Sequence, residues 1–105
     1  IDYKEREMSG SSALSLAKIE LHYFLNNCFL KDNEILDSLN NIKNMPTYIV
    51  QGRHDTICPP FTALKLKEAL PNSNLIMVDN AGHSAFETGI KKALITALND
   101  LRNQI

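Results

Sequence analysis

Asp55 and His83 are the residues of this sequence best suited to chemistry, because each lies in a short loop that follows a run of β-branched and aliphatic residues. In α/β enzymes, catalytic groups stand at the carboxyl ends of parallel strands, where side chains converge on a crevice. If the two loops meet, Asp55 would accept the Nδ1 hydrogen of His83 and stabilise the imidazolium that forms when His83 takes a proton from a nucleophile. The pair predicts acid–base catalysis, and neither loop supplies the nucleophile.

Both residues also have plainer interpretations. Asp55 shortly precedes Pro59-Pro60 and a predicted helix, whose dipole would stabilise an acid near its N-terminus. A loop histidine after a glycine is often a surface or capping residue, which is the alternative for His83. We expect Arg53, in the first loop, to form a structural ion pair.

The elements that carry the two loops alternate between strand and helix. Short strands are predicted over residues 47–51 and 74–78, and helices over residues 61–70 and 85–103. This order predicts two parallel strands joined by a right-handed crossover. Both loops would then leave the same edge of one sheet.

The earlier part of the chain is predicted to be helical. Residues 11–30 contain no Gly or Pro, and their apolar side chains recur at three- and four-residue steps. On this helix, Glu20 shares a face with Leu16 and Phe24, and a carboxylate among apolar neighbours is costly to bury without a cation. We therefore consider Glu20 either a solvated residue or a binding group for a cation.

Three segments follow from these patterns: a helical segment over residues 1–33, an Asn-rich connector over residues 34–45, and an α/β part over residues 46–105. Two parallel strands need neighbouring strands and helices over both faces. We therefore expect this chain to be the C-terminal part of a larger protein.

Composition disfavours several classes of function. The 11 basic and 12 acidic residues give a net charge of −1 and are interspersed, so no basic stripe can neutralise a nucleic acid backbone. The longest aliphatic run, residues 75–78, is far too short for a membrane span, and the N-terminus has no signal-peptide core.

Cys28 and Cys58 lack metal-ligand spacing, so we expect no metal, no disulfide and a cytoplasmic location. A thiol nucleophile acting with His83 is the weaker hypothesis.

The sequence resembles the C-terminal third of proline iminopeptidases, serine peptidases of the α/β-hydrolase fold. The resemblance is densest over residues 17–24, 46–60 and 81–87. A strand followed by Gly-Arg-x-Asp, here residues 52–55, is shared by many α/β-hydrolases, and so is the Gly-His pair. The Ile-Glu-Leu-His-Tyr-Phe stretch over residues 19–24 narrows the resemblance to this family.

The resemblance implies a role for four residues. Asp55 would be the acid and His83 the base of a Ser-Asp-His triad. Glu20 would be one of the carboxylates that hold the N-terminal ammonium of the substrate, and Phe24 a wall of the proline pocket. Residues 1–33 would be the remnant of a helical cap domain.

The resemblance further implies a serine aminopeptidase that releases N-terminal proline from peptides and needs neither a metal nor an organic cofactor. No serine here lies on a Gly-x-Ser-x-Gly-like elbow, so we expect the nucleophile upstream of Ile1, in the rest of the hydrolase chain, and no activity from this segment alone. Another α/β-hydrolase acting on esters, amides or epoxides is the alternative enzyme. A non-catalytic domain of the same fold is the alternative of a different class.

Overall fold

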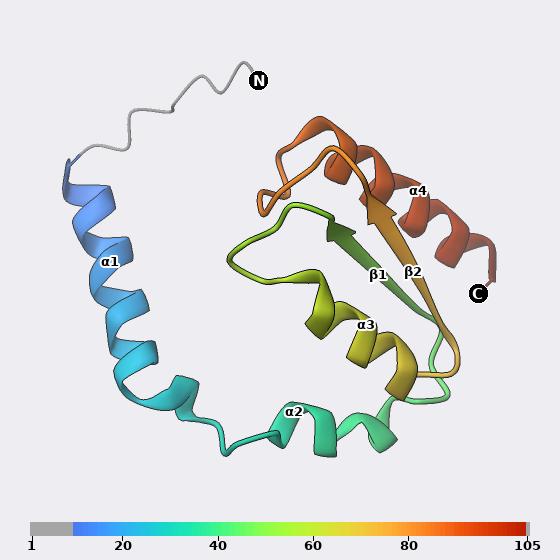
Figure 1. Ribbon diagram of the computed structural model, residues 1–105, viewed down its shortest axis with the longest axis horizontal. Coiled ribbons are helices and arrows are strands. Elements are labelled where there is room, and N and C mark those ends of the chain that lie inside the picture. Colours follow the sequence, from blue (N-terminus) through green and yellow to red (C-terminus); the bar gives the residue numbers. More distant parts are fainter. Residues whose placement is uncertain (1–9, 105) are drawn as a thin grey trace. The chain divides into compact units, whose positions relative to one another are not determined.

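The computed structural model describes residues 10–104 and divides the chain into two compact units, Ile1–Ile35 and Leu36–Ile105 (Figure 1). The three-segment division expected from the sequence stays a prediction, and residues 1–9 of its first segment lie outside the described residues. Among the described residues, no helix is both long and apolar enough to cross a membrane.

Helix α1, Gly10–Leu25, forms most of the first unit and is shorter than the helix predicted over residues 11–30. The Asn26 side chain donates a hydrogen bond to the His22 carbonyl oxygen at 2.8 Å, which closes the last turn. Residues Asn27, Cys28 and Phe29 then adopt left-handed backbone angles, with φ of 49°, 54° and 57°. Asparagine tolerates this region better than most residues, so the Asn26-Asn27 pair ends the helix where periodicity alone would continue it.

Aromatic contacts hold the turn that follows α1, a 3₁₀ turn over Asn27–Phe29. The ring of Phe29 lies 5.4 Å from those of both His22 and Tyr23, the latter edge to face. Such pairs contribute about 0.5 to 1.5 kcal/mol beyond their buried area. The cluster thus offsets part of the cost of the left-handed backbone.

A connecting segment of short helices follows. Helix α2, Glu34–Asp37, begins where the Glu34 carboxylate accepts a hydrogen bond from the Lys31 backbone N–H at 2.7 Å. A second 3₁₀ turn, Leu39–Asn41, buries Leu39 to 7% exposure.

The second unit contains the predicted sheet. Strands β1, Thr47–Gly52, and β2, Ser73–Val78, are parallel, with Thr47 opposite Ser73 and Gly52 opposite Val78. Their bounds differ from the predicted ones by one residue, and the predicted parallel pairing is confirmed. Both strands therefore end at the same edge.

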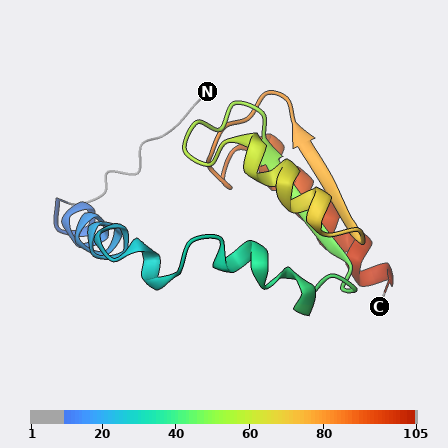
Figure 2. The same ribbon diagram turned by 60° about the horizontal axis from the view of Figure 1, so that its bottom comes forward.

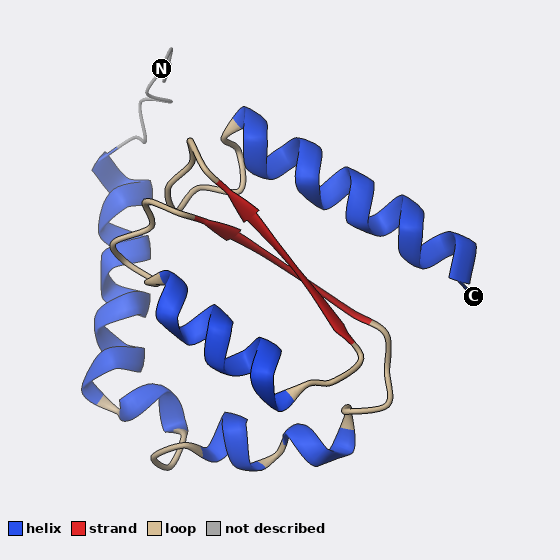
Figure 3. Ribbon diagram, turned by 45° about the vertical axis from the view of Figure 1, so that its right-hand side comes forward, coloured by secondary structure: helices blue, strands red, loops and turns tan. Residues whose placement is uncertain are grey.

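Helices cover both faces of this sheet. Helix α3, Pro60–Ala69, connects β1 to β2 on one face, and helix α4, Thr88–Gln104, packs on the other (Figures 2 and 3). Pro60 at the start of α3 fits its first turn, where the missing N–H is no loss.

The core lies between the sheet and the two helices. Leu70, at the end of α3, is the most buried large side chain among the described residues, at 2% exposure. Ala63 contributes from α3, and Ile90 and Ala97 contribute from α4. Truncating a leucine buried to this degree costs about 2 to 5 kcal/mol, so Leu70 holds the crossover helix onto the strands that carry the two loops.

Candidate active site

The two loops are joined by backbone hydrogen bonds as soon as they leave the sheet. The N–H of Arg53 donates to the Val78 carbonyl at 3.0 Å, and the N–H of His54 donates to the Ala81 carbonyl at 2.9 Å. These bonds continue the ladder between β1 and β2 beyond the last strand residues. The loop after β1 is thereby held against the loop after β2, so that side chains from both can meet.

Asp55 and His83 meet at this junction. Nδ1 of His83 lies 3.0 Å from Oδ2 and 3.2 Å from Oδ1 of Asp55. The Asp55 side chain is 8% exposed, whereas that of His83 is 50% exposed. A buried carboxylate therefore faces one nitrogen of an imidazole that is open to solvent on its other side.

The Asp55 carboxylate has further hydrogen-bond donors in its own loop. Its Oδ1 accepts from the backbone N–H of Ile57 at 3.0 Å and from that of Cys58 at 2.8 Å. Both donors precede α3, so Asp55 organises the loop ahead of the helix and does not cap its first turn.

These donors lower the pKa of Asp55. Burial by itself raises the pKa, but the hydrogen bonds from the Cys58 N–H, from His83 and from the Ile57 N–H outweigh it, so that the pKa lies below the ordinary value of 3.8. Asp55 is therefore a carboxylate at neutral pH. An ionised Asp55 requires a hydrogen on Nδ1 of His83, which leaves Nε2 as the nitrogen that can accept a proton.

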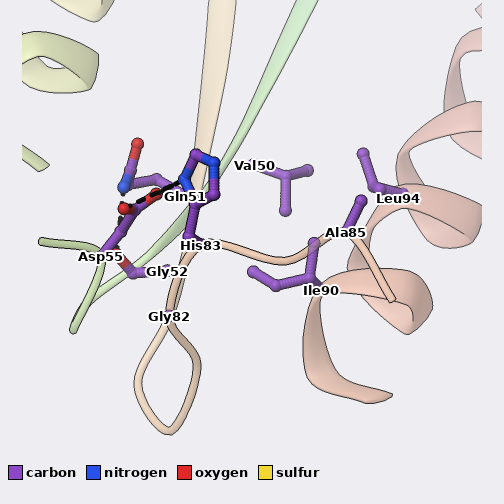
Figure 4. Close-up of a pocket in the computed structure, with 9 residues that line it drawn as sticks. All are labelled: Val50, Gln51, Gly52, Asp55, Gly82, His83, Ala85, Ile90 and Leu94. Atoms are coloured by element: carbon purple, nitrogen blue, oxygen red, sulfur yellow. Dashed lines mark hydrogen bonds and ion pairs between the residues drawn. The ribbon is translucent and has the colours of Figure 1, made fainter. Parts of the chain in front are cut away.

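A pocket of about 210 Å³ adjoins the pair. Asp55, His83 and Gln51 lie at its polar end, as Figure 4 shows. Its apolar wall comes from β1, from the loop after β2 and from α4, through the side chains of Val50, Ala85, Ile90 and Leu94. The His83 imidazole thus lies between the apolar wall of the pocket and the Asp55 carboxylate.

Gln51 supports the Asp55 loop from the next-to-last residue of strand β1. Its side-chain amide donates to the carbonyl oxygens of Gly52 and Cys58, both at 3.0 Å. It therefore ties the two ends of the loop in which Asp55 lies.

Glu87 is a residue of this site that the sequence analysis missed. Its carboxylate accepts hydrogen bonds from the backbone N–H groups of Gly82, at 3.0 and 3.1 Å, and Ser84, at 3.2 Å. These contacts also explain why α4 begins at Thr88 and not at residue 85 as predicted: residues 84–87 form a turn that precedes the helix. An acid directly before a helix is a recognisable N-terminal signal.

Arg53 forms the ion pair that the sequence suggested. Its Nε lies 2.6 Å from Oδ1 of Asp79, and the two side chains are 54% and 70% exposed. An exposed pair of this kind contributes about 0 to 1 kcal/mol. Its role is to join the two loops on their outer side.

Glu20 and Phe24 lie on α1, in the first unit. Both are exposed, Phe24 to 68%. The structure therefore brings Asp55 and His83 together, while the roles of Glu20 and Phe24 in substrate binding stay predictions.

Cys28 and Cys58 are free and exposed thiols.

No group of three or more metal-ligating side chains occurs among the residues that the structure describes. The titratable groups that line the pocket are the Asp55 carboxylate and the His83 imidazole, which are groups of acid–base chemistry.

The amino-acid sequence of this chain is similar to those of known proteins. A family model described as the alpha/beta hydrolase fold matches residues 6–90. The chain is 49% identical over 84 residues to a probable proline iminopeptidase of Leptolyngbya boryana, a match that covers 79% of this chain and 26% of that protein. It is 44% identical over 86 residues to the proline iminopeptidase of Arabidopsis thaliana, covering 81% of this chain and 23% of that protein.

A third relative, the proline iminopeptidase of Neisseria gonorrhoeae, is 40% identical over 91 residues, which cover 86% of this chain and 29% of that protein. The chain thus spans about a quarter of the length of the curated relatives that it matches.

Proposed function

This chain belongs to the α/β-hydrolase fold family, and on that premise we propose that Asp55 and His83 are the acid and base of a Ser-Asp-His triad. The observation that carries the proposal is the contact between the buried Asp55 carboxylate and Nδ1 of His83, at the edge where β1 and β2 both end. The nucleophilic serine and the oxyanion hole come from parts of the protein outside these 105 residues.

The mechanism follows from the two ring nitrogens of His83. Asp55 holds the Nδ1 hydrogen, so Nε2 accepts the hydroxyl proton as the serine oxygen attacks the carbonyl carbon of the scissile bond. Asp55 stabilises the imidazolium, which then gives its proton to the leaving amine as the carbon–nitrogen bond breaks. Water attacks the resulting acyl-enzyme in the same way, with His83 again as the base.

The substrate that we propose is a peptide with an N-terminal proline. Support comes from relatives named proline iminopeptidases and from the Ile-Glu-Leu-His-Tyr-Phe stretch at residues 19–24. Glu20 would pair with the secondary ammonium of the proline, and Phe24 would contact its ring. The Phe24 side chain is 68% exposed within the described residues. The two free cysteines fit a reducing compartment such as the cytoplasm.

The proposal is tested on the full-length protein that contains this chain. Proline arylamide should be hydrolysed, and N-acetylproline arylamide, which lacks the ammonium, should be turned over far more slowly. A fluorophosphonate, which reacts with activated serines whatever the substrate, should label one serine and abolish turnover.

Each other outcome points to a different function. Labelling without turnover of proline arylamide, together with turnover of simple esters, would assign the chain to another hydrolase of the same fold. Absence of both labelling and turnover would contradict the triad and favour a non-catalytic binding domain. The 105-residue chain alone should be inactive in every assay.

A further inference from the structure

We propose that Glu87 is a positioning residue for His83: its carboxylate clamps the backbone on both sides of the histidine and so sets where the imidazole stands against Asp55. The proposal rests on the catalytic role proposed above for His83. It assigns a function to a group that acts through the backbone and not through the reacting atoms.

The contacts of Glu87 bracket His83. Oε1 accepts from the N–H of Gly82 at 3.1 Å and from the N–H of Ser84 at 3.2 Å, and Oε2 accepts from the N–H of Gly82 at 3.0 Å. The residues immediately before and after His83 are thus fixed by one carboxylate. Hydrogen bonds to an ionised acceptor are about twice as strong as neutral ones, so the clamp is stiffer than a turn held by carbonyls alone.

The clamp acts on the part of the loop that carries His83. Residues 81–84 belong to neither β2 nor α4, and the His83 side chain is half exposed, so packing alone does not fix it. Asp55, by contrast, is 8% exposed and is held by two backbone donors of its own loop. Of the two partners, the histidine is the more exposed, and the backbone on both sides of it is held by the Glu87 carboxylate.

Glu87 is itself anchored to the fold through α4. Its carbonyl oxygen accepts the first hydrogen bond of the helix, from the Lys91 N–H at 2.9 Å. At the second residue of the helix, Gly89 lies so close to β2 that a Cβ atom there would come within 2.7 Å of the Val78 side chain. The start of α4 therefore packs closely against β2, the strand that leads to His83. The Glu87 carboxylate links the start of this helix to the loop that follows the strand.

The consequence is a coupling between the first turn of α4 and the imidazole. A misplacement of a catalytic group by about 1 Å can reduce a rate about a hundredfold even when binding is unchanged. Loss of the clamp should therefore lower kcat and leave KM nearly unaltered.

The test uses Glu87→Ala, Glu87→Gln and Glu87→Asp in the full-length protein. Glu87→Ala removes both acceptors and should lower kcat for proline arylamide about tenfold to a hundredfold, with KM within about twofold. Glu87→Gln keeps one oxygen that can accept from both N–H groups but loses the second acceptor and the charge. Its kcat should therefore fall between those of the parent and of Glu87→Ala. Glu87→Asp keeps the charge but shortens the reach, and should resemble Glu87→Ala.

Two measurements separate this proposal from the proposed substrate. The rate of labelling by a fluorophosphonate needs the triad but no proline, and it should fall in Glu87→Ala and to a smaller extent in Glu87→Gln. The proton-NMR signal of the His83 Nδ1 hydrogen, assigned by its loss in His83→Ala, needs no reaction at all and should shift or broaden in Glu87→Ala.

Glu68→Ala, which removes an exposed carboxylate from α3, is the matched control and should change none of these readouts. An unchanged NMR signal in both Glu87→Ala and Glu87→Asp would overturn the proposal, whatever the substrate proves to be. So would a parent-like labelling rate in Glu87→Asp, because it would show that the reach of the acceptor does not matter. If Glu87→Ala does not fold, Glu87→Asp and Glu87→Gln decide the matter between them.

Discussion

Gly52 and Gly82 lie so close together that a Cβ atom on Gly52 would come within 2.1 Å of the Gly82 carbonyl oxygen. It would also come within 2.7 Å of the Ala81 carbonyl oxygen, and both of these atoms belong to backbone that cannot swing aside as a flexible side chain can. The absence of a side chain at the end of β1 is what lets the loop of Asp55 approach the loop of His83.

Gly52→Ala should therefore separate the two loops. We expect activity on proline arylamide to fall at least about a hundredfold, because displacing the carboxylate from the imidazole by about 1 Å is enough for such a loss. Steady-state kinetics of the full-length variant measure this. Asn74→Ala, an exposed change on β2 that adds no atoms, should leave activity unchanged; parent-like activity in Gly52→Ala would show that the close approach is not required.

Asp55→Asn tests the tautomer of His83. The amide keeps the shape of the carboxylate but no longer requires a hydrogen on Nδ1, so Nε2 is no longer held as the base. We expect kcat to fall about ten-thousandfold, with the protein still folded. Near-normal kcat in a folded Asp55→Asn variant would be incompatible with the proposed role.

The lowered pKa of Asp55 predicts a dependence of stability on pH. Because the pKa is lower in the folded state than in the unfolded chain, the ionised form stabilises the fold fully above about pH 3.8, and this contribution is lost as the pH falls through the folded pKa. The difference in unfolding free energy between the parent and Asp55→Asn should therefore shrink on acidification. Urea unfolding between about pH 6 and pH 3 measures it.

A residue without a titratable side chain serves as the control for this pH series. Asn74→Ala, at an exposed position on β2, removes no titratable group, so its difference from the parent should not change in step with the ionisation of Asp55. An Asp55→Asn difference that stays constant down to pH 3 would mean that the hydrogen bonds to Asp55 do not stabilise the fold.

Glu20→Gln tests the substrate assignment. The change keeps the shape and removes the charge that is proposed to hold the substrate ammonium. Loss of one partner of a desolvated charge pair costs about 2 to 5 kcal/mol, so kcat/KM for proline arylamide should fall roughly thirtyfold or more, while a neutral ester is hydrolysed almost as before. Equal losses of kcat/KM on both substrates would mean that Glu20 supports the fold and does not bind the ammonium. Asp32→Asn is the control and should leave the hydrolysis of both substrates unchanged.

The sequence predicted the parts of this structure that depend on local pattern. The aliphatic runs set β1 and β2, and the strand–helix–strand order set their parallel direction, so the meeting of Asp55 with His83 followed from sheet geometry. The predictions for the C-terminal end of α1 and for the start of α4 were wrong, because each depends on one polar side chain. Asn26 closes α1 through a hydrogen bond that periodicity does not register, and Glu87 turns back to the His83 loop before α4 begins.

The contact that brings Glu87 to the site could not be foreseen from spacing. It depends on how closely α4 approaches β2, and this approach is possible because Gly89 has no side chain. The role of Gly52 could not be foreseen either, because it depends on the backbone of Ala81 and Gly82, which lies against it in the folded chain.

The most direct test of the account is a comparison of two histidines in the full-length protein. His83→Ala removes the proposed base, whereas His54→Ala removes an exposed imidazole from the neighbouring loop, one residue before Asp55. We expect kcat/KM for proline arylamide to fall about ten-thousandfold or more in His83→Ala and to stay within about twofold in His54→Ala. A folded His83→Ala variant that keeps the activity of His54→Ala would contradict the central claim that Asp55 and His83 form the catalytic pair.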